Sequence, residues 1–292
     1  MSRGPVLLRR TPAALANGAL AAGQELVWLA AHALTYPVGL LAEQVAMEDS
    51  RYRIDTLSPL TRGLILADIG AAGRPVVLVH GIGDNRSAFT ILRRTLRRRG
   101  FGRIVTVNYS PLTSDVRKAA ADLARHVERV CQQSGYEQVF VVGHSLGGII
   151  ARYYVQRLAG DARVSTLITL GSPHAGSPLA RMAPPLLVGR QLRPNSELMR
   201  ELAGPARCST RFVAIYSDRD AVVPHHSARL EHPDLLVTAL RVRGVGHLSL
   251  LANSSVAHAI AAALVSEAGL LADGLSDRQE PESADDSPIP AV

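Results

Sequence analysis

The strongest indication of the fold of this chain is the segment Val141-Val142-Gly143-His144-Ser145-Leu146-Gly147-Gly148. Its first residues end an apolar run, 138–142, that is typical of a strand buried on both faces. Its last residues open the segment 146–158, which predicts a helix. A Gly-x-Ser-x-Gly sequence between such a strand and helix predicts a nucleophile elbow. Glycine is needed two residues before and after Ser145, because a side chain there would clash in so tight a turn.

The sequence around this turn alternates between strand and helix from Arg74 onward. Apolar runs predict strands at 75–80, 104–109, 138–142, 164–170, 211–216 and 235–242. Between or after them, helices are expected at 87–99, 115–133, 146–158 and 254–265. This alternation predicts an α/β fold, with a mostly parallel sheet and helices on both of its faces.

The chain divides into four parts by composition. Residues 1–50 form an apolar, helix-prone segment, 51–73 a linker, 74–268 the α/β domain and 269–292 an acidic tail expected to be disordered. The uncharged part of the first segment, 26–42, is shorter than the roughly 20 residues that cross a bilayer. A docked or interfacial helix, a membrane anchor and a signal peptide all stay open for it. We expect a cytoplasmic or peripherally membrane-associated protein, with secretion or anchoring through this segment left open.

The charge pattern argues against a nucleic-acid partner. The formal net charge is +7, but Lys118 is the single lysine among 32 basic residues. The arginines are scattered along the chain, and no aromatic-rich face accompanies them. Cys131 and Cys208 are interpreted as two lone thiols, although a disulfide between them stays open. The sequence has no HExxH or CxxC spacing, so we predict no metal and no cofactor.

A serine nucleophile needs a base, and the base needs an acid that orients it. His247 lies directly after the last predicted strand, in Gly244-Val245-Gly246-His247, and is therefore the candidate base. His225 and His226 precede that strand and are interpreted as a solvated helix start. Asp220 follows the strand 211–216 and is preferred as the acid over Asp218, because Val222 and Val223 can bury the turn around it.

The tetrahedral chemistry of such a serine also needs hydrogen-bond donors where negative charge develops. The backbone N–H of Leu146, next to the nucleophile, is one expected donor. The second is assigned to the backbone N–H of Ile82, in the turn His80-Gly81-Ile82-Gly83 after the first strand. Together these residues predict an oxyanion hole.

These motifs resemble those of bacterial triacylglycerol lipases and esterases of the α/β-hydrolase superfamily. The resemblance rests on VVLVHGIGD at 76–84, VVGHSLGGIIARYY at 141–154, TLGSPHAGSP at 169–178, DAVVP at 220–224 and GVGHLSLL at 244–251. It implies an α/β-hydrolase fold, a Ser145-Asp220-His247 triad and a lipid or acyl-ester substrate. His174, within the third motif, is interpreted as a structural neighbour of the site.

Substrate recognition is expected from the segment 177–207, which is rich in proline and apolar residues and predicts a small cap or lid. A surface excursion with its own small core is the alternative for this segment. The candidate substrate-binding residues are Met182, Leu186 and Leu187 in the cap, together with His80 and His144 beside the turns.

The predicted activity is hydrolysis of carboxylic esters through an acyl-enzyme, with esters of fatty acids as the expected substrates. Thioester cleavage or acyl transfer with the same triad is the alternative that the sequence leaves open. A non-catalytic binding protein of the same fold is much less favoured, because no member of the triad is missing.

Overall fold

The computed structural model describes residues 73–82, 84–109, 115–181 and 188–265. The predicted N-terminal segment 1–50, almost all of the linker 51–73, the tail 269–292 and the candidate residues Met182, Leu186 and Leu187 lie outside these ranges. Predictions that concern them therefore stay predictions.

A six-stranded sheet forms the centre of the described domain, in the order β2-β1-β3-β4-β5-β6, and each neighbouring pair of strands is parallel. The strands are β1 (Val76–Val79), β2 (Ile104–Val107), β3 (Val139–His144), β4 (Val164–Leu170), β5 (Arg211–Ser217) and β6 (Leu236–Val242). Parallel strands end at the same edge of a sheet, so the turns after β1, β3, β5 and β6 are brought together. The predicted fold class is confirmed.

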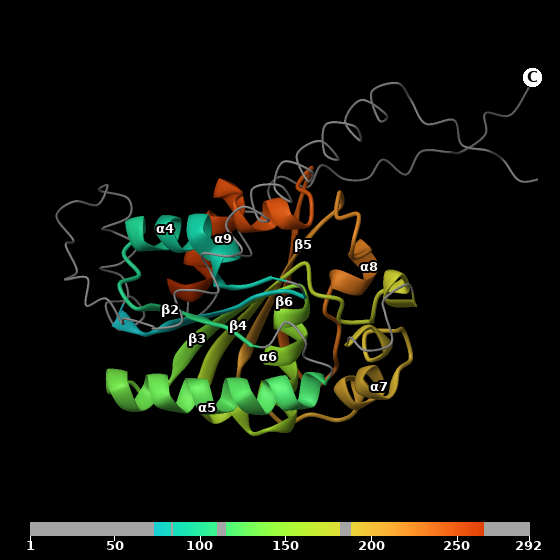
Figure 1. Ribbon diagram of the computed structural model, residues 1–292, viewed down its shortest axis with the longest axis horizontal. Coiled ribbons are helices and arrows are strands. Elements are labelled where there is room, and N and C mark those ends of the chain that lie inside the picture. The colour runs from blue at the N-terminus through green and yellow to red at the C-terminus, as the bar shows by residue number, and fades with distance from the viewer. Residues whose placement is uncertain (1–72, 83, 110–114, 182–187, 266–292) are drawn as a thin grey trace, which may run out of the picture.

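Helices cover both faces of the sheet (Figure 1). On one side lie α5 (Val116–Ser134) and α6 (Leu146–Arg157), and on the other α4 (Thr90–Arg98) and α9 (Ser254–Val265). Shorter helices connect or flank these layers. They are η2 (Arg86–Phe89), η3 (Gly160–Ala162), η4 (Pro178–Arg181), η5 (Val188–Arg190), α7 (Glu197–Ala203), α8 (His225–Ala228) and η6 (Leu248–Leu251).

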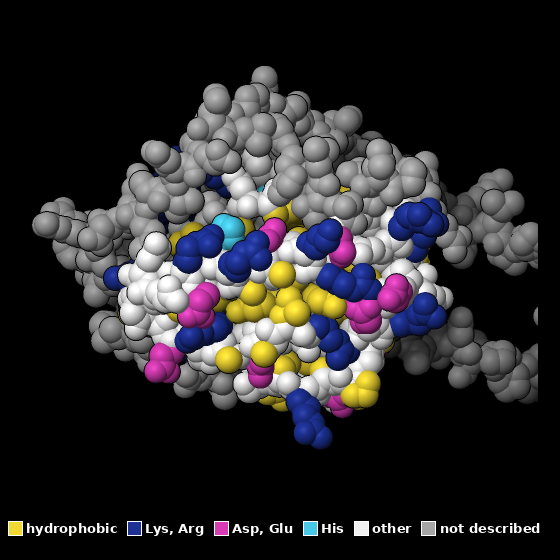
Figure 2. Space-filling model, turned by 60° about the horizontal axis from the view of Figure 1, so that its bottom comes forward, with side chains coloured by type: hydrophobic (Ala, Val, Ile, Leu, Met, Phe, Trp, Pro, Cys, Tyr) yellow, Lys and Arg dark blue, Asp and Glu magenta, His cyan; other side chains and the backbone are white. Residues whose placement is uncertain are grey.

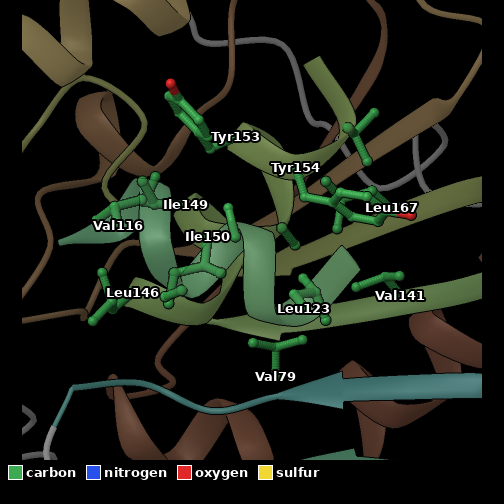
Figure 3. Packing of buried hydrophobic residues seen from close by; sticks show 14 of the residues in the cluster. Val79, Val116, Leu123, Val141, Leu146, Ile149, Ile150, Tyr153, Tyr154 and Leu167 are labelled. Atoms are coloured by element: carbon green, nitrogen blue, oxygen red, sulfur yellow. The ribbon is translucent and has the colours of Figure 1, made fainter. Parts of the chain in front are cut away.

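Alternate residues of each central strand enter two separate cores. Val79 and Val141 pack with Leu123 of α5 and Ile150 of α6, as Figure 3 shows from close by. Their neighbours Leu78 and Val142 pack on the other side, among the residues of α4 and α9. Because both faces are buried, the strands consist of continuous apolar runs instead of alternating polar and apolar residues. This is why the sequence displayed them so clearly.

Two predicted elements have different bounds in the structure: one α-helix begins later than expected, and one strand ends earlier. The helix expected at 87–99 starts as η2, where the Asn85 side chain accepts a hydrogen bond from the Ser87 N–H at 2.9 Å, and continues as α4 from Thr90. The strand expected at 104–109 ends at Val107, where its partner β1 ends at Val79. After it, Asn108 Oδ1 accepts from the Arg86 N–H at 2.9 Å.

The described part of the predicted cap packs firmly on the domain. Val188, Leu192, Leu198, Met199 and Leu202 are buried in the same core as α5 and α6. The Gln191 side chain accepts from the Val116 N–H at 2.8 Å and donates to Asp115 at 3.0 Å. Arg117 forms two hydrogen bonds with Glu201 of α7. The apolar side chains of 188–203 are thus used for packing.

The side of the molecule that carries α5 comes forward in Figure 2. Basic and acidic side chains are interspersed there with small apolar areas. On α5 itself, Asp122 bonds Arg125, and Glu128 bonds Arg163 at 2.9 Å. Of the helices that the structure describes, none combines the length and apolar character needed to cross a membrane.

Candidate active site

Ser145 occupies the turn between β3 and α6, in a backbone conformation that few residues other than glycine adopt. Its φ is 52° and its ψ is −121°, and its N–H bonds the carbonyl of Leu170 on β4 at 2.9 Å. Such strain persists only where the surrounding structure enforces it, and it is concentrated at functional sites. Ser145 also stands at the N-terminus of α6, where the helix dipole favours negative charge.

The flanking glycines are enforced by contacts. A Cβ at Gly143 would lie 2.5 Å from the Cα of Gly148, and one at Gly147 would lie 2.1 Å from the carbonyl oxygen of Val79. Both distances are impossible for real atoms. The backbone of the first turn of α6 therefore packs directly against the end of β1, and this contact holds Ser145 at the carboxyl edge of the sheet.

His247 and Asp220 form a buried pair. His247 Nδ1 lies 2.7 Å from Asp220 Oδ2, with side-chain exposures of 6% and 0%. Because a carboxylate accepts, Nδ1 carries the shared proton, and Nε2 is left as the basic nitrogen. The other carboxylate oxygen of Asp220 accepts from the N–H groups of Val222, at 2.9 Å, and Val223, at 2.7 Å. Asp220 is thereby fixed in orientation.

Asp218, the competing acid, has different partners. It accepts from the Gly244 N–H at 2.8 Å and from the Arg241 guanidinium at 3.2 Å. These bonds tie the end of β5 to the loop after β6, which carries His247. Of the two aspartates, the structure thus brings Asp220 to the imidazole and leaves Asp218 to brace the loop.

His144 links the serine turn to the histidine loop. Its Nε2 lies 3.2 Å from the carbonyl oxygen of His247, and the two imidazole centroids are 4.7 Å apart. Burial, and secondarily the neighbouring His247, lowers the pKa of His144 from 6.5 to about 4. His144 is therefore neutral at pH 7, with its proton on Nε2. Since His144 precedes Ser145 in the chain, this bond brings Ser145 and His247 into one site.

The turn predicted to supply the second oxyanion donor lies against the serine. A Cβ at Gly81 would lie 3.2 Å from Ser145 Cβ and 3.3 Å from His144 Nδ1. Such contacts are tighter than most real Cβ contacts, so a side chain at position 81 would require its neighbours to move by a few tenths of an ångström. The backbone of Gly81 and Ile82 thus borders the place where a substrate carbonyl would meet Ser145.

The candidate substrate residues His80 and His144 lie behind this turn. Each is only 1% exposed. The His80 ring stacks on Tyr109, with centroids 4.1 Å apart and an interplanar angle of 11°. In this conformation both rings support the backbone of the site, and their contact with substrate stays a prediction.

The remaining histidines near the motifs fit their predicted places. Buried His174 bonds Thr169 at 2.9 Å, and burial lowers its pKa well below 6.5. Arg152 of α6 reaches the His174 carbonyl at 3.3 Å and the Leu202 carbonyl at 2.8 Å. His225 and His226 are exposed on α8.

Two residues near the site were not predicted from the sequence. Gly171, after β4, has φ 55°, and a Cβ there would lie 2.9 Å from Asp220 Oδ2 and 3.2 Å from His247 Nδ1. Its place at the end of a strand beside β3 was the available signal. Tyr109 follows β2, and its hydroxyl reaches the backbone of the turn at Gly81. An isolated tyrosine carries no pattern that would have identified it.

The described ranges contain no group of three or more His, Cys, Asp or Glu side chains arranged to hold a metal ion. Cys131 and Cys208 are both free thiols.

Comparison with known proteins reveals relatives over the first part of the domain. The sequence model of the palmitoyl protein thioesterase family matches residues 75–204, which is less than half of the chain. Triacylglycerol lipases from Burkholderia plantarii and Pseudarthrobacter phenanthrenivorans are 31% and 32% identical over 125 and 123 residues. These matches cover 40% and 39% of this chain, but only 34% and 38% of the two lipases.

The fold has a solved counterpart in the mature lipase BlEst2 of Bacillus licheniformis. The two structures superpose with a TM-score of 0.56 at 20% identity, over 67% of this chain and 93% of the lipase. At this identity the likeness shows the fold alone. The chain thus has the α/β-hydrolase fold and is related in sequence to lipases and esterases of that superfamily, as its motifs predicted.

Proposed function

We propose that this relative of lipases and esterases is a serine hydrolase that cleaves carboxylic esters, with Ser145 as nucleophile, His247 as base and Asp220 as the orienting acid. The observation that carries the proposal is the buried His247–Asp220 pair beside a serine with φ 52°. A serine hydroxyl is a weak nucleophile until a base takes its proton, and an oriented, neutral imidazole supplies that base.

The proposed reaction proceeds in two halves. Ser145 Oγ attacks the ester carbonyl while His247 Nε2 takes the proton, and the tetrahedral oxyanion accepts hydrogen bonds from the N–H groups of Ile82 and Leu146. The C–O bond to the alcohol then breaks, and His247 returns the proton to the leaving oxygen. Water attacks the acyl-enzyme by the same route and releases the carboxylic acid. Asp220 stabilises the imidazolium in both halves without taking a proton.

A fatty-acyl substrate is the second part of the proposal. It is supported by the names of the related proteins, triacylglycerol lipases and a palmitoyl protein thioesterase family. The thioesterase match also favours a second candidate, the cleavage of acyl thioesters. Both reactions use the same attack by Ser145 and differ in the leaving group, an alcohol or a thiol.

Active-site labelling tests the catalytic assignment. A fluorophosphonate probe should label the wild-type chain and leave Ser145→Ala unlabelled, with Ser255→Ala, at an exposed serine of α9, as the labelled control. Equal labelling of wild type and Ser145→Ala would contradict the assignment of Ser145. An unlabelled wild type that also lacks ester and thioester hydrolysis would favour the non-catalytic alternative.

A substrate panel tests the class of leaving group. p-Nitrophenyl esters from C2 to C16, a triacylglycerol emulsion and a palmitoyl thioester should be compared by kcat/KM. Preference for long oxygen esters supports the lipase reading, and preference for the thioester supports the second candidate. A rate that falls steadily above C4 would contradict the fatty-acyl proposal while keeping the esterase.

The domain organisation is proposed on the sequence pattern. Residues 74–268 would form the catalytic unit, and the segment 1–50 would mediate contact with a membrane surface. Fractionation of the full chain against a version that begins at Ser50 tests this. Equal recovery of both in the soluble fraction would contradict membrane contact.

A further inference from the structure

The orientation of the second oxyanion donor is set by a carbonyl group on the other side of its own peptide unit. The C=O of Gly81 and the N–H of Ile82 belong to one peptide plane, and in a trans peptide they point in opposite directions. No cis peptide bond is present among the described residues. Whatever holds the Gly81 carbonyl therefore also aims the Ile82 N–H.

Tyr109 is one of the groups that hold this carbonyl. Its hydroxyl lies 3.0 Å from the carbonyl oxygen of Gly81 and 2.6 Å from that of His80. The hydroxyl thus faces two successive carbonyls of the turn, with one proton directed between them. Burial, and secondarily the charge of Asp84, raises the pKa of Tyr109 well above 10, which keeps the proton in place at all working pH values.

The same carbonyl receives support from two further groups. His80 Nδ1 lies 2.9 Å from the Gly81 oxygen, and the Asp84 N–H reaches it at 3.4 Å. The His80 ring in turn lies flat on the Tyr109 ring. The stacked side chains of His80 and Tyr109 therefore hold the turn, because their polar atoms contact the backbone oxygens of His80 and Gly81.

Because position 81 is a glycine, hydrogen bonds from other groups are needed to keep its peptide in one orientation. Gly81 has no side chain to restrict its backbone, and glycine adopts a wider range of φ and ψ than any other residue. A side chain here would be crowded, because its Cβ would lie 3.2–3.3 Å from atoms of Ser145, Asp84 and His144. Rotation of the Gly81–Ile82 peptide would turn the carbonyl oxygen, instead of the N–H, toward the reacting centre.

We propose that Tyr109 is a positioning residue of the oxyanion hole, whose hydroxyl holds the Gly81–Ile82 peptide with its N–H directed at the developing oxyanion. This inference rests on the proposed function. Tyr109 touches no reacting atom in this arrangement, and it acts through the orientation of the peptide. A group that serves the oxyanion contributes more in the transition state than in the bound substrate, so kcat should respond more than KM.

Tyr109→Phe is the decisive variant, because it keeps the ring stacked on His80 and removes only the hydroxyl. We expect kcat for p-nitrophenyl ester hydrolysis to fall about 10- to 100-fold with KM changed less than about 2-fold, a part of what loss of a whole oxyanion donor costs. An alkyl trifluoromethyl ketone, which forms a tetrahedral adduct with an oxyanion, should bind more weakly by a similar factor. Binding of the carboxylic acid product should change little.

The matched control is Tyr136→Phe, since Tyr136 precedes β3 and lies at the opposite edge of the sheet. Its kcat and inhibitor affinity should equal those of the wild type. Thermal melting and fluorophosphonate titration of each variant give the folded and reactive fraction, so that kcat is expressed per competent site.

Two results would overturn the inference while the proposed function stands. One is a Tyr109→Phe enzyme with wild-type kcat and wild-type affinity for the ketone. The other is a variant whose kcat per competent site is unchanged and whose loss of activity follows its loss of folded protein. A wild-type chain that neither hydrolyses the esters nor reacts with fluorophosphonate would instead contradict the proposed function itself.

Discussion

The Nε2 atom of His144 lies 3.2 Å from the carbonyl oxygen of His247, so the residue before the candidate nucleophile holds the backbone of the candidate base. The bond joins the end of β3 to the loop after β6, between residues that are 103 positions apart in sequence. It requires a neutral His144 with its proton on Nε2, and burial ensures this by lowering the pKa of the imidazole to about 4.

This pKa predicts how stability depends on pH. In the unfolded chain His144 titrates near 6.5, so between pH 6.5 and 4 the unfolded state binds more protons than the folded state. The free energy of unfolding should therefore decrease as the pH falls through this range, by up to about 3 kcal/mol from His144 alone. His174, whose pKa is also lowered by burial, contributes in the same direction. Urea denaturation at pH 7, 6 and 5 measures the effect.

A His144→Gln variant should be less stable at pH 7 and should show a shallower decrease toward pH 5. The exposed residue His225 offers the control, since His225→Gln should keep the wild-type slope. If the two variants have equal slopes, the assignment of the pH dependence to His144 is wrong.

The two aspartates after β5 provide a matched pair of substitutions. Asp220→Asn should lower kcat roughly 10³- to 10⁴-fold, because the amide no longer stabilises the imidazolium and favours the wrong tautomer of His247. Asp218→Asn should keep kcat within about 10-fold, since Asp218 bonds Gly244 and Arg241 and not the imidazole. Ester hydrolysis of both variants, measured at equal folded fraction, checks this. The reverse ranking would exchange their roles.

Gly147 should tolerate no side chain. In Gly147→Ala the new methyl group would meet the Val79 carbonyl oxygen at 2.1 Å, which forces β1 and α6 apart. We expect a loss of at least about 3 kcal/mol of folding free energy, the scale of a severe core clash. Gly135→Ala is the control, because Gly135 has φ 76° but nothing within 4 Å, so only about 1–2 kcal/mol of backbone strain is expected. Similar melting temperatures for both variants would contradict the prediction.

Arg152 should matter for stability more than most charged residues, because it lies on the largely buried helix α6 and is only 3% exposed. Its guanidinium is buried, burial lowers its pKa to about 9, and its bonds to the carbonyls of His174 and Leu202 hold the segment after β4 and helix α7 to α6. Arg152→Met leaves those carbonyls without a donor and should cost about 2–4 kcal/mol. Arg125→Met, at an exposed site on α5, should cost less than about 0.5 kcal/mol. Chemical denaturation compares them, and equal losses would show that the buried bonds contribute nothing specific.

The amino-acid sequence by itself determined the α/β fold and the order of its strands and helices. Strands buried on both faces must be continuous apolar runs, and the turn at Ser145 must be flanked by glycines, so both features appear as local patterns. The candidates Ser145, Asp220 and His247 could be chosen because parallel strands end at one edge of the sheet, and each residue lies in the turn or loop that follows a strand.

The contacts between the side chains of the candidate site became known only from the tertiary structure. Whether Asp218 or Asp220 meets His247 depends on the path of a turn over a few ångströms. The apolar residues Val222 and Val223 favoured Asp220 in the sequence, but only the folded chain shows the 2.7 Å contact between Asp220 and His247. Tyr109 and Arg152 bond backbone carbonyls of residues distant in sequence, and such bonds depend on geometry and not on the identity of the accepting residue. The Ser145 turn can therefore be predicted from the sequence, whereas the contacts that orient His247 and Asp220 form only in the folded chain.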